Sequence, residues 1–478
     1  MNASQGEEGK SCDSISVRRR RALLNSLLAV VITGLLLAVA CAQEHTPALQ
    51  ATGAPTISAT PRTPAPGDRS SAAPTAPVTT TNTLTLTIWG PDFMGPTADA
   101  PGGAVLAAQI DAFCKAHPGW QIRYVRKRPY GVGGVTQYLS AARAVAPDSL
   151  PDLALVDMRE IGLLAAVSLP QPLEPILGAD VVADLMPFAR EAGQVGDHLL
   201  AAQYEADIGF LAYNSGVIST PPTTWSQVLA GQAGYLLPIG ASEGAVYDAF
   251  LPQYLALGGK VWDANGRPYL DETIVAEILE AYRAALQAGI LSSAGLNLKD
   301  ASDCWPVYLT GQAPSGSLAV AMTNVSSWDY DRDRGRLART RVSPLPTLSG
   351  TPISMSDGWG WVLISRDNQR RAIAADFLRA VLQPDAMAAW SQATFHLPTR
   401  RSALPLAIKD SDYLHFLQQT METATPEPRE PAYSQIVAAL SPAIENVARG
   451  LVSPQTAAAE AAERVRTSSE QPSPTTQH

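Results

Sequence analysis

Between Leu84 and the mid-460s, short apolar segments alternate with amphipathic segments of helical length. The series begins with the strand-like TLTLTIW, the helical GAVLAAQIDAFCKAH and the strand-like WQIRYV, and it continues to the apolar strand LALV. Strands separated by helices of this length are joined by right-handed crossovers and pair in parallel. The pattern therefore predicts an α/β fold with a mainly parallel sheet and flanking helices.

The same order recurs in the second half of the chain. A strand YLLPI, two helices and a strand LAVAM are followed by the strand GWGWVLI and two closing helices. One sheet would have to be oversized to hold all these strands. We therefore expect two α/β lobes.

Candidate ligand-binding residues follow from the strand order alone. Ligands of open parallel sheets bind beyond the carboxyl ends of the strands. Aromatic and acidic residues that follow a predicted strand, or lie between two apolar stretches, are Trp89, Asp92, Asp157, Tyr204, Glu205 and Trp328. They are expected at a cleft between the lobes, although a single Trp is more often a packing residue than a ligand platform.

Several segments in this order and spacing resemble the family 1 extracellular solute-binding proteins. They are LTLTIWG, AHPGWQIRYV, LPDLALVD, FLAYNSGV, PPTTWSQVL, AVAMTNVSSW, VSPLPTLSG, AADFLRAVLQPDAMAAW and HLPTRRSAL. This family delivers ligands to ABC importers and includes maltodextrin and other sugar binders. The resemblance implies a two-lobe periplasmic-binding-protein-like fold with several crossovers at the hinge, and a ligand held in the cleft as the lobes close.

The resemblance also divides the chain. Residues 84–210 and 350–395 would form lobe 1, and residues 211–349 and 396–466 would form lobe 2, with crossings near LAYN, after PLPTLSG and near FHLP. The polar residues 467–478 are expected to be a loose tail.

A sugar ring has an apolar C–H face and a rim of hydroxyls, so it suits an aromatic plate beside charged hydrogen-bonding groups. The resemblance places Trp328 at the position that stacks on sugar in maltodextrin-binding members. Trp359 lies where the family returns to the cleft, although Trp359 and Trp361 could equally belong to a strand with one buried face. The stretch LLAAQYEADIG replaces a proline-containing strand of the family, which leaves the roles of Tyr204 and Glu205 open.

The N-terminal region predicts export. A basic cluster precedes the apolar run from Ala22 to Ala40, which is close to the ~20 residues that span a bilayer. No basic cluster follows the run, and small residues lead into Cys41. We expect residues 1–40 to be a lipoprotein signal peptide and Cys41 to carry the lipid; an ordinary signal or a retained anchor is the alternative. The Pro/Thr/Ala-rich residues 41–83 are expected to be a disordered tether.

One motif would be consistent with a serine hydrolase. GASEG, from Gly240 to Gly244, matches the G-x-S-x-G nucleophile elbow between a strand and a helix, with Ser242 as the nucleophile and His396 or His415 as the base. No His-Gly-Gly stretch that could supply an oxyanion hole precedes it. A simple turn is the preferred interpretation, and we expect no catalytic residues.

Other classes of function have little support. The 6 histidines form no H-E-x-x-H motif and no Walker-type loop is present, so no metal or cofactor is expected. With 35 basic and 44 acidic residues, the chain has no basic stripe for nucleic acid. Cys114 and Cys304 could form a disulfide, but two buried free thiols are an equal alternative.

These expectations combine into one function. The protein is expected to be a monomeric lipoprotein on the outer face of the cell membrane that captures a sugar or oligosaccharide and delivers it to ABC permease subunits. A sensor lipoprotein that signals to a receptor kinase would use the same cleft, and the sequence does not separate the two.

Overall fold

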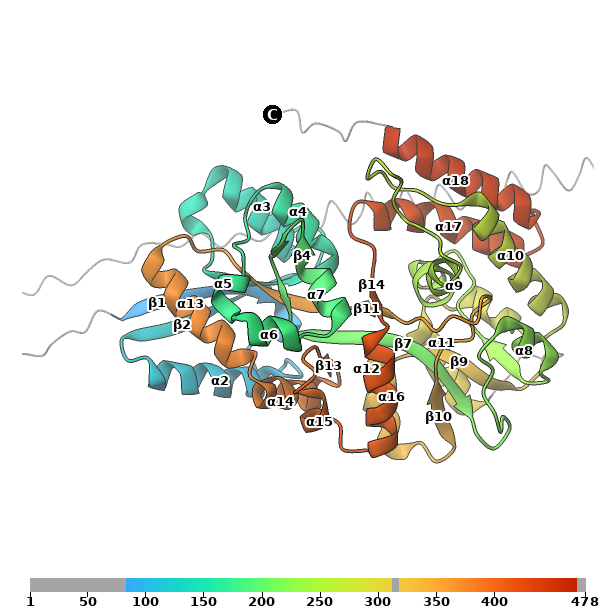
Figure 1. Cartoon of the computed structure of the whole chain (residues 1–478), viewed down its shortest axis with the longest axis horizontal. Coiled ribbons are helices and arrows are strands. Elements are labelled where there is room, and N and C mark those ends of the chain that lie inside the picture. Colours follow the sequence, from blue (N-terminus) through green and yellow to red (C-terminus); the bar gives the residue numbers. More distant parts are fainter. Residues whose placement is uncertain (1–82, 312–317, 471–478) are drawn as a thin grey trace, which may run out of the picture. The chain divides into compact units, whose positions relative to one another are not determined.

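The computed structural model describes residues 83–311 and 318–470, all within one compact unit, Thr79–His478 (Figure 1). The expected signal peptide, the lipid-bearing Cys41 and nearly all of the expected tether lie outside the described residues. Within the described ranges, no helix combines the length and the apolar character that a membrane crossing requires.

The first sheet is formed mostly by the N-terminal part of the described chain. Its strand order is β2(Trp120–Lys127), β1(Leu84–Pro91), β3(Leu153–Asp157), β12(Trp359–Leu363) and β6(Ala202–Gln203). Strand β1 pairs in parallel with β2 and β3, whereas β12 runs antiparallel to both of its neighbours. Every residue of β3 is buried, as a continuous apolar run in a central strand predicts.

Four helices pack around the first sheet and supply much of its core. They are α2(Gly103–Ala116), α3(Val135–Val145), α13(Asn368–Val381) and α14(Pro384–Thr394). Phe113 of α2 and Phe377 of α13 meet edge to face, with ring centroids 5.3 Å apart. The α/β prediction for this part of the chain is confirmed.

The second sheet is built around the long strand β7(Glu205–Asn214) (Figure 1). The sheet order is β14(Thr425–Pro426), β11(Met355–Asp357), β7, β9(Val320–Ser326) and β8(Gly234–Leu236), and β10(Thr340–Ser343) and β13(Leu397–Pro398) also pair with β7. All four strands that pair directly with β7 run antiparallel to it. The expectation of a mainly parallel second sheet is therefore wrong in strand direction, although the two-sheet α/β architecture is confirmed.

The chain passes between the sheets at Tyr204, at Gly358 and again between β12 and β13. Tyr204 separates β6 of the first sheet from β7 of the second. The first crossing therefore lies before LAYN, the segment at which the crossing was predicted. Gly358 separates β11 from β12, which places the return after the expected boundary at residue 350. Gly358 has a φ of +146°, and a Cβ there would lie 2.1 Å from the backbone oxygen of Glu205, so only glycine fits this crossing.

Three C-terminal and central helices pack together beside the second sheet. Helix α10(Glu272–Gln287) is capped at its N-terminus by Asp271, whose side chain accepts hydrogen bonds from the N–H groups of Thr273 and Ile274. It packs with α17(Ala432–Ala448) and α18(Pro454–Glu470). Helix α18 extends four residues, 467–470, into the segment expected to be a loose tail; residues 471–478 of that segment lie outside the described residues.

Both remaining cysteines are free thiols. Cys304 is buried and Cys114 is half-buried. Of the two alternatives, the structure therefore shows free thiols and no disulfide between them.

Candidate ligand-binding site

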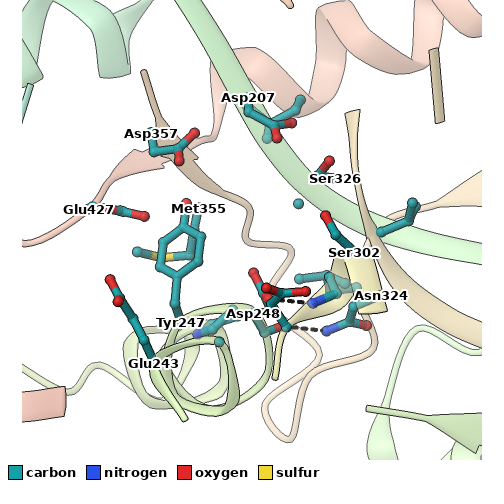
Figure 2. A pocket seen from close by; sticks show the side chains of 18 of the residues that line it. Asp207, Glu243, Tyr247, Asp248, Ser302, Asn324, Ser326, Met355, Asp357 and Glu427 are labelled. Atoms are coloured by element: carbon teal, nitrogen blue, oxygen red, sulfur yellow. Dashed lines mark hydrogen bonds between the residues drawn. The ribbon is translucent and has the colours of Figure 1, made fainter. Parts of the chain in front are cut away.

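A cavity of about 310 Å³ opens beside the carboxyl end of β9 (Figure 2). Strands β7, β9 and β11, the start of α17 and the loop after β14 contribute to its wall, and Arg159 reaches it from the turn after β3 of the first sheet. The second sheet and the turn after β3 thus supply lining residues. This location fits the rule that ligands bind beyond strand ends.

The lining is dominated by carboxyl groups. They belong to Asp207, Glu243, Asp248, Asp300, Asp357 and Glu427. Arg159 is the one cationic side chain in this lining, and the aromatic rings are those of Tyr247 and Tyr433. Such a wall offers hydrogen-bond acceptors and two ring faces to a polar ligand.

Three of these carboxyl groups have raised pKa values. Burial raises the pKa of Asp248 to about 7, opposed by a hydrogen bond from the N–H of Ala301. Burial also holds the pKa of Asp357 and of Glu427 well above the ordinary range. Because burial disfavours the charged form, these groups hold protons more tightly than exposed carboxyl groups do.

Arg159 connects the cavity to the first sheet. Its Nη2 lies 2.8 Å from Oδ2 of Asp157, its Nη1 lies 3.3 Å from Oε1 of Glu243, and its Nε lies 3.1 Å from Oε2 of Glu427. The guanidinium group also lies 5.0 Å from the ring centroid of Tyr433. The positive charge of Arg159 therefore offsets the negative charges of carboxylates that come from separate parts of the chain.

None of the seven residues predicted to bind ligand lines this cavity. Asp157 comes nearest, because it is buried at the end of β3 and accepts hydrogen bonds from Arg159 and from the hydroxyl of Tyr130. Trp359 is also close to the end of the first sheet, where its ring contacts Phe93 and Tyr130.

The other predictions on the first sheet fall on packing or surface positions. Trp89 is a core residue, with the Lys127 ammonium 4.4 Å from its ring centroid. Asp92 is exposed and accepts a hydrogen bond from the N–H of Phe93.

The residues at the first crossing are structural. Tyr204 is 1% exposed and packs between the rings of Trp361 and Trp390. Glu205 is 2% exposed, and its Oε2 accepts a hydrogen bond of 2.6 Å from Nε1 of Trp390. Both side chains are thus buried beside the crossing, and their part in ligand binding remains a prediction.

Trp328 lies next to the cavity without lining it. Its backbone N–H donates to Oδ1 of Asp207, and its ring nitrogen donates to the carbonyl of Thr394. The Arg332 guanidinium group lies 4.6 Å from its ring centroid. Its role as the main stacking surface remains a prediction, and this geometry does not favour it.

Sequence reasoning missed the residues that do line the cavity. Arg159 lies two positions after Asp157, and Asp357 immediately precedes the crossing glycine of SDGWGW, so both were close to positions already selected. Tyr247 lies in a π-helical turn, Ala245–Phe250, and Glu427 follows a two-residue strand. No periodic sequence pattern predicts that Tyr247 or Glu427 lines a cavity.

The GASEG segment forms a turn. Oγ of Ser242 donates to the carbonyl of Lys299 and accepts from the N–H of Ala245. Nδ1 of His396 lies 3.7 Å from Glu205, and His415 contacts Gln419. The described residues therefore contain no Ser-His pair at this elbow, and they contain no group of three or more metal-ligating side chains arranged to hold an ion.

We expect Ser242→Ala to leave ligand affinity within about twofold of wild type, because the hydroxyl serves the turn. A fluorophosphonate probe should not label the wild-type protein at Ser242. Stoichiometric labelling of Ser242, detected by mass spectrometry, would contradict this expectation.

Comparison with known proteins agrees with this architecture. A maltotriose-binding protein from Pyrococcus abyssi is 23% identical over 206 residues, which are 41% of this chain and 42% of that protein, so the match spans less than half of the relative. The solved structure of a cyclic α-maltosyl-1,6-maltose binding protein from Arthrobacter globiformis has a TM-score of 0.64 at 21% identity, covering 80% of this chain and 98% of that one. A sugar-binding protein from Xanthomonas citri has a TM-score of 0.65 at 19% identity, covering 80% and 97%.

The structural likenesses show a shared two-lobe fold. The sequence evidence for the family is more extensive. The sequence profile described as bacterial extracellular solute-binding protein matches residues 108–414, which is more than half of the chain. The chain therefore belongs to the bacterial extracellular solute-binding protein family.

Proposed function

We propose that this protein captures a sugar or oligosaccharide outside the cytoplasm and delivers it to the permease subunits of an ABC importer. The observation that carries the proposal is the cavity beside β9, which combines tyrosine rings with many hydrogen-bonding groups and is lined by strands of the second sheet and by Arg159 from the turn after β3. The family membership and the sugar-binding relatives support it. The protein acts in this proposal as a binding protein and catalyses no reaction.

Membrane attachment through Cys41 is part of the same proposal. A lipid at the end of a long Pro/Thr/Ala-rich segment would keep the binding unit close to its permease. Mass spectrometry of the mature protein tests this, since the first residue should be a lipid-modified Cys41. A mature, unlipidated protein that begins at another residue would contradict it.

Tyr247 is the residue with which to test the cavity. Its ring stands inside the cavity, and its hydroxyl points toward the side occupied by Asp357 and Glu427 (Figure 2). A tyrosine that stacks on a sugar contributes apolar contact area and a hydrogen-bonding hydroxyl.

We expect Tyr247→Ala to weaken saccharide binding by roughly tenfold to a hundredfold, which corresponds to about 1.4 to 2.7 kcal/mol. Isothermal titration calorimetry with maltotriose and longer maltodextrins measures the change. Tyr269→Ala is the matched control, because Tyr269 is 41% exposed and lies outside the cavity. Equal affinities for wild type and Tyr247→Ala would exclude this cavity as the binding site.

A further inference from the structure

The cavity has an unusual balance of charge for a site that binds a neutral sugar. Six carboxyl groups and one guanidinium group line it, so its formal net charge is −5 when all are ionised (one minus six). The guanidinium group of Arg159 is shared with Asp157, which lies outside the lining. The positive charge available to the cavity wall is therefore even smaller than this count suggests.

Two of the carboxyl groups have oxygen atoms that accept no hydrogen bond from the described residues; Glu427 is buried and Asp357 is half-buried. The side chain of Glu427 is 3% exposed. Although Nε of Arg159 lies 3.1 Å from its Oε2, that N–H donates to Asp157, and Oε2 accepts no hydrogen bond. No hydrogen bond or ion pair within the described residues involves the carboxylate of Asp357, which reaches into the cavity (Figure 2).

Two other carboxylates of the lining already accept hydrogen bonds from the protein. Oδ1 of Asp207 accepts from the hydroxyl of Ser327 and from the N–H of Trp328, and Oδ2 of Asp248 accepts from the N–H of Ala301. The carboxylate of Asp357 and Oε2 of Glu427 thus have acceptor capacity to spare. Buried negative charge is costly, and the one guanidinium group beside Glu427 is shared with Asp157 and Glu243, so these two groups favour a ligand that brings positive charge and N–H donors.

A metal ion does not fit this arrangement. Within the described residues, no three acidic, histidine or cysteine side chains come close enough together to coordinate one ion. The carboxyl groups are instead distributed around a cavity of about 310 Å³, beside the rings of Tyr247 and Tyr433. Dispersed acceptors and aromatic faces suit an organic ammonium group, which donates up to three hydrogen bonds and is attracted to ring faces.

We propose that the preferred ligand is an amine-bearing saccharide, whose ammonium group binds between Asp357 and Glu427 while its hydroxyls contact the rest of the lining. This inference rests on the proposed function, because it specifies the class of sugar that the same cavity accepts. An ammonium group placed there replaces the missing hydrogen bonds and reduces the net negative charge of the lining.

The test compares two ligands of the same length. A glucosamine trimer carries amines, and its fully N-acetylated counterpart is neutral. We expect wild-type protein to bind the amine-bearing trimer at least tenfold more tightly by isothermal titration calorimetry at about pH 6.5 and low salt. Asp357→Asn should reduce that preference about tenfold. A bound ammonium group stabilises the charged form of Asp357, which burial disfavours in the free protein, and the isosteric amide cannot form that ion pair.

Two further variants make the result specific. Glu243→Gln alters a carboxylate that is 61% exposed at the edge of the cavity, so it should fold normally and reduce the preference by a smaller factor, about two to threefold. Asp148→Asn is the control, because Asp148 is exposed and lies outside the cavity. It should leave both affinities unchanged.

The outcomes separate this inference from the proposed function. Equal binding of the two trimers, or a preference unchanged in Asp357→Asn, would overturn the inference and leave carbohydrate capture intact. Binding of spermidine together with no binding of either trimer or of maltotriose would contradict both.

Discussion

Arg159→Met should lower the free energy of unfolding by about 3 kcal/mol near pH 8, because removing one member of a buried ionic cluster leaves the other members uncompensated. The side chains of Asp157 and Glu427 are 5% and 3% exposed, and Arg159 is the guanidinium group that lies against both. Methionine retains most of the apolar part of the arginine side chain. The decrease in the free energy of unfolding therefore reflects mainly the loss of the positive charge.

The loss should be smaller at pH 5 than at pH 8. Burial already raises the pKa of Glu427, and Arg159 and a hydrogen bond with Tyr247 both oppose this, so loss of Arg159 raises the pKa further. A carboxyl group with a raised pKa takes up a proton as the pH falls, which relieves the uncompensated charge. Urea denaturation at the two pH values measures the difference.

Arg128→Met is the control for this experiment, since Arg128 is exposed and lies outside the ionic cluster. Its effect should stay within about 0.5 kcal/mol. Equal free energies of unfolding for Arg159→Met and Arg128→Met at both pH values would contradict this prediction. They would show that the ionic cluster does not stabilise the contact between the turn after β3 and the cavity wall.

Gly358→Ala should destabilise the protein by roughly 3 kcal/mol through backbone strain and a direct clash. The residue has a φ of +146°, and an added Cβ would meet the Glu205 carbonyl at 2.1 Å. The N–H of Met158 donates to the carbonyl of Gly358, so a shift of the crossing would also disturb the turn that carries Arg159.

Gly209→Ala is the matched control, because Gly209 lies in β7 with no atom within 4 Å of an added Cβ. It should change the free energy of unfolding by less than about 1 kcal/mol. Thermal unfolding of both variants provides the comparison. A Gly358→Ala protein with the melting temperature of Gly209→Ala would show that the crossing tolerates a side chain.

The fold was largely predictable because its main elements carry strong local patterns. The continuous apolar run of β3 predicts a central strand, and the buried positions Val275, Ile278, Leu279 and Tyr282 of α10 follow the helical period. Strand direction in the second sheet was not predictable in this way. It depends on β7 and β11, whose antiparallel pairing follows from where the chain crosses between sheets.

The site was less predictable for a related reason. Aromatic and acidic residues after strands were the right kinds of residue, and Asp157 was one contact from the cavity through Arg159. The same residue types also serve the core, as Trp89 and Tyr204 show. The lining itself depends on Tyr247 and Glu427, which are brought together by tertiary contacts and have no local signal.

The crystal structure of the protein with a bound saccharide is the most direct test of the account. We predict ligand density in the cavity beside β9, in contact with the ring of Tyr247 and with ligand donors about 2.7–3.2 Å from the carboxylates of Asp357 or Glu427. Density stacked on Trp328 or elsewhere, with this cavity containing only water, would contradict the assignment of the site.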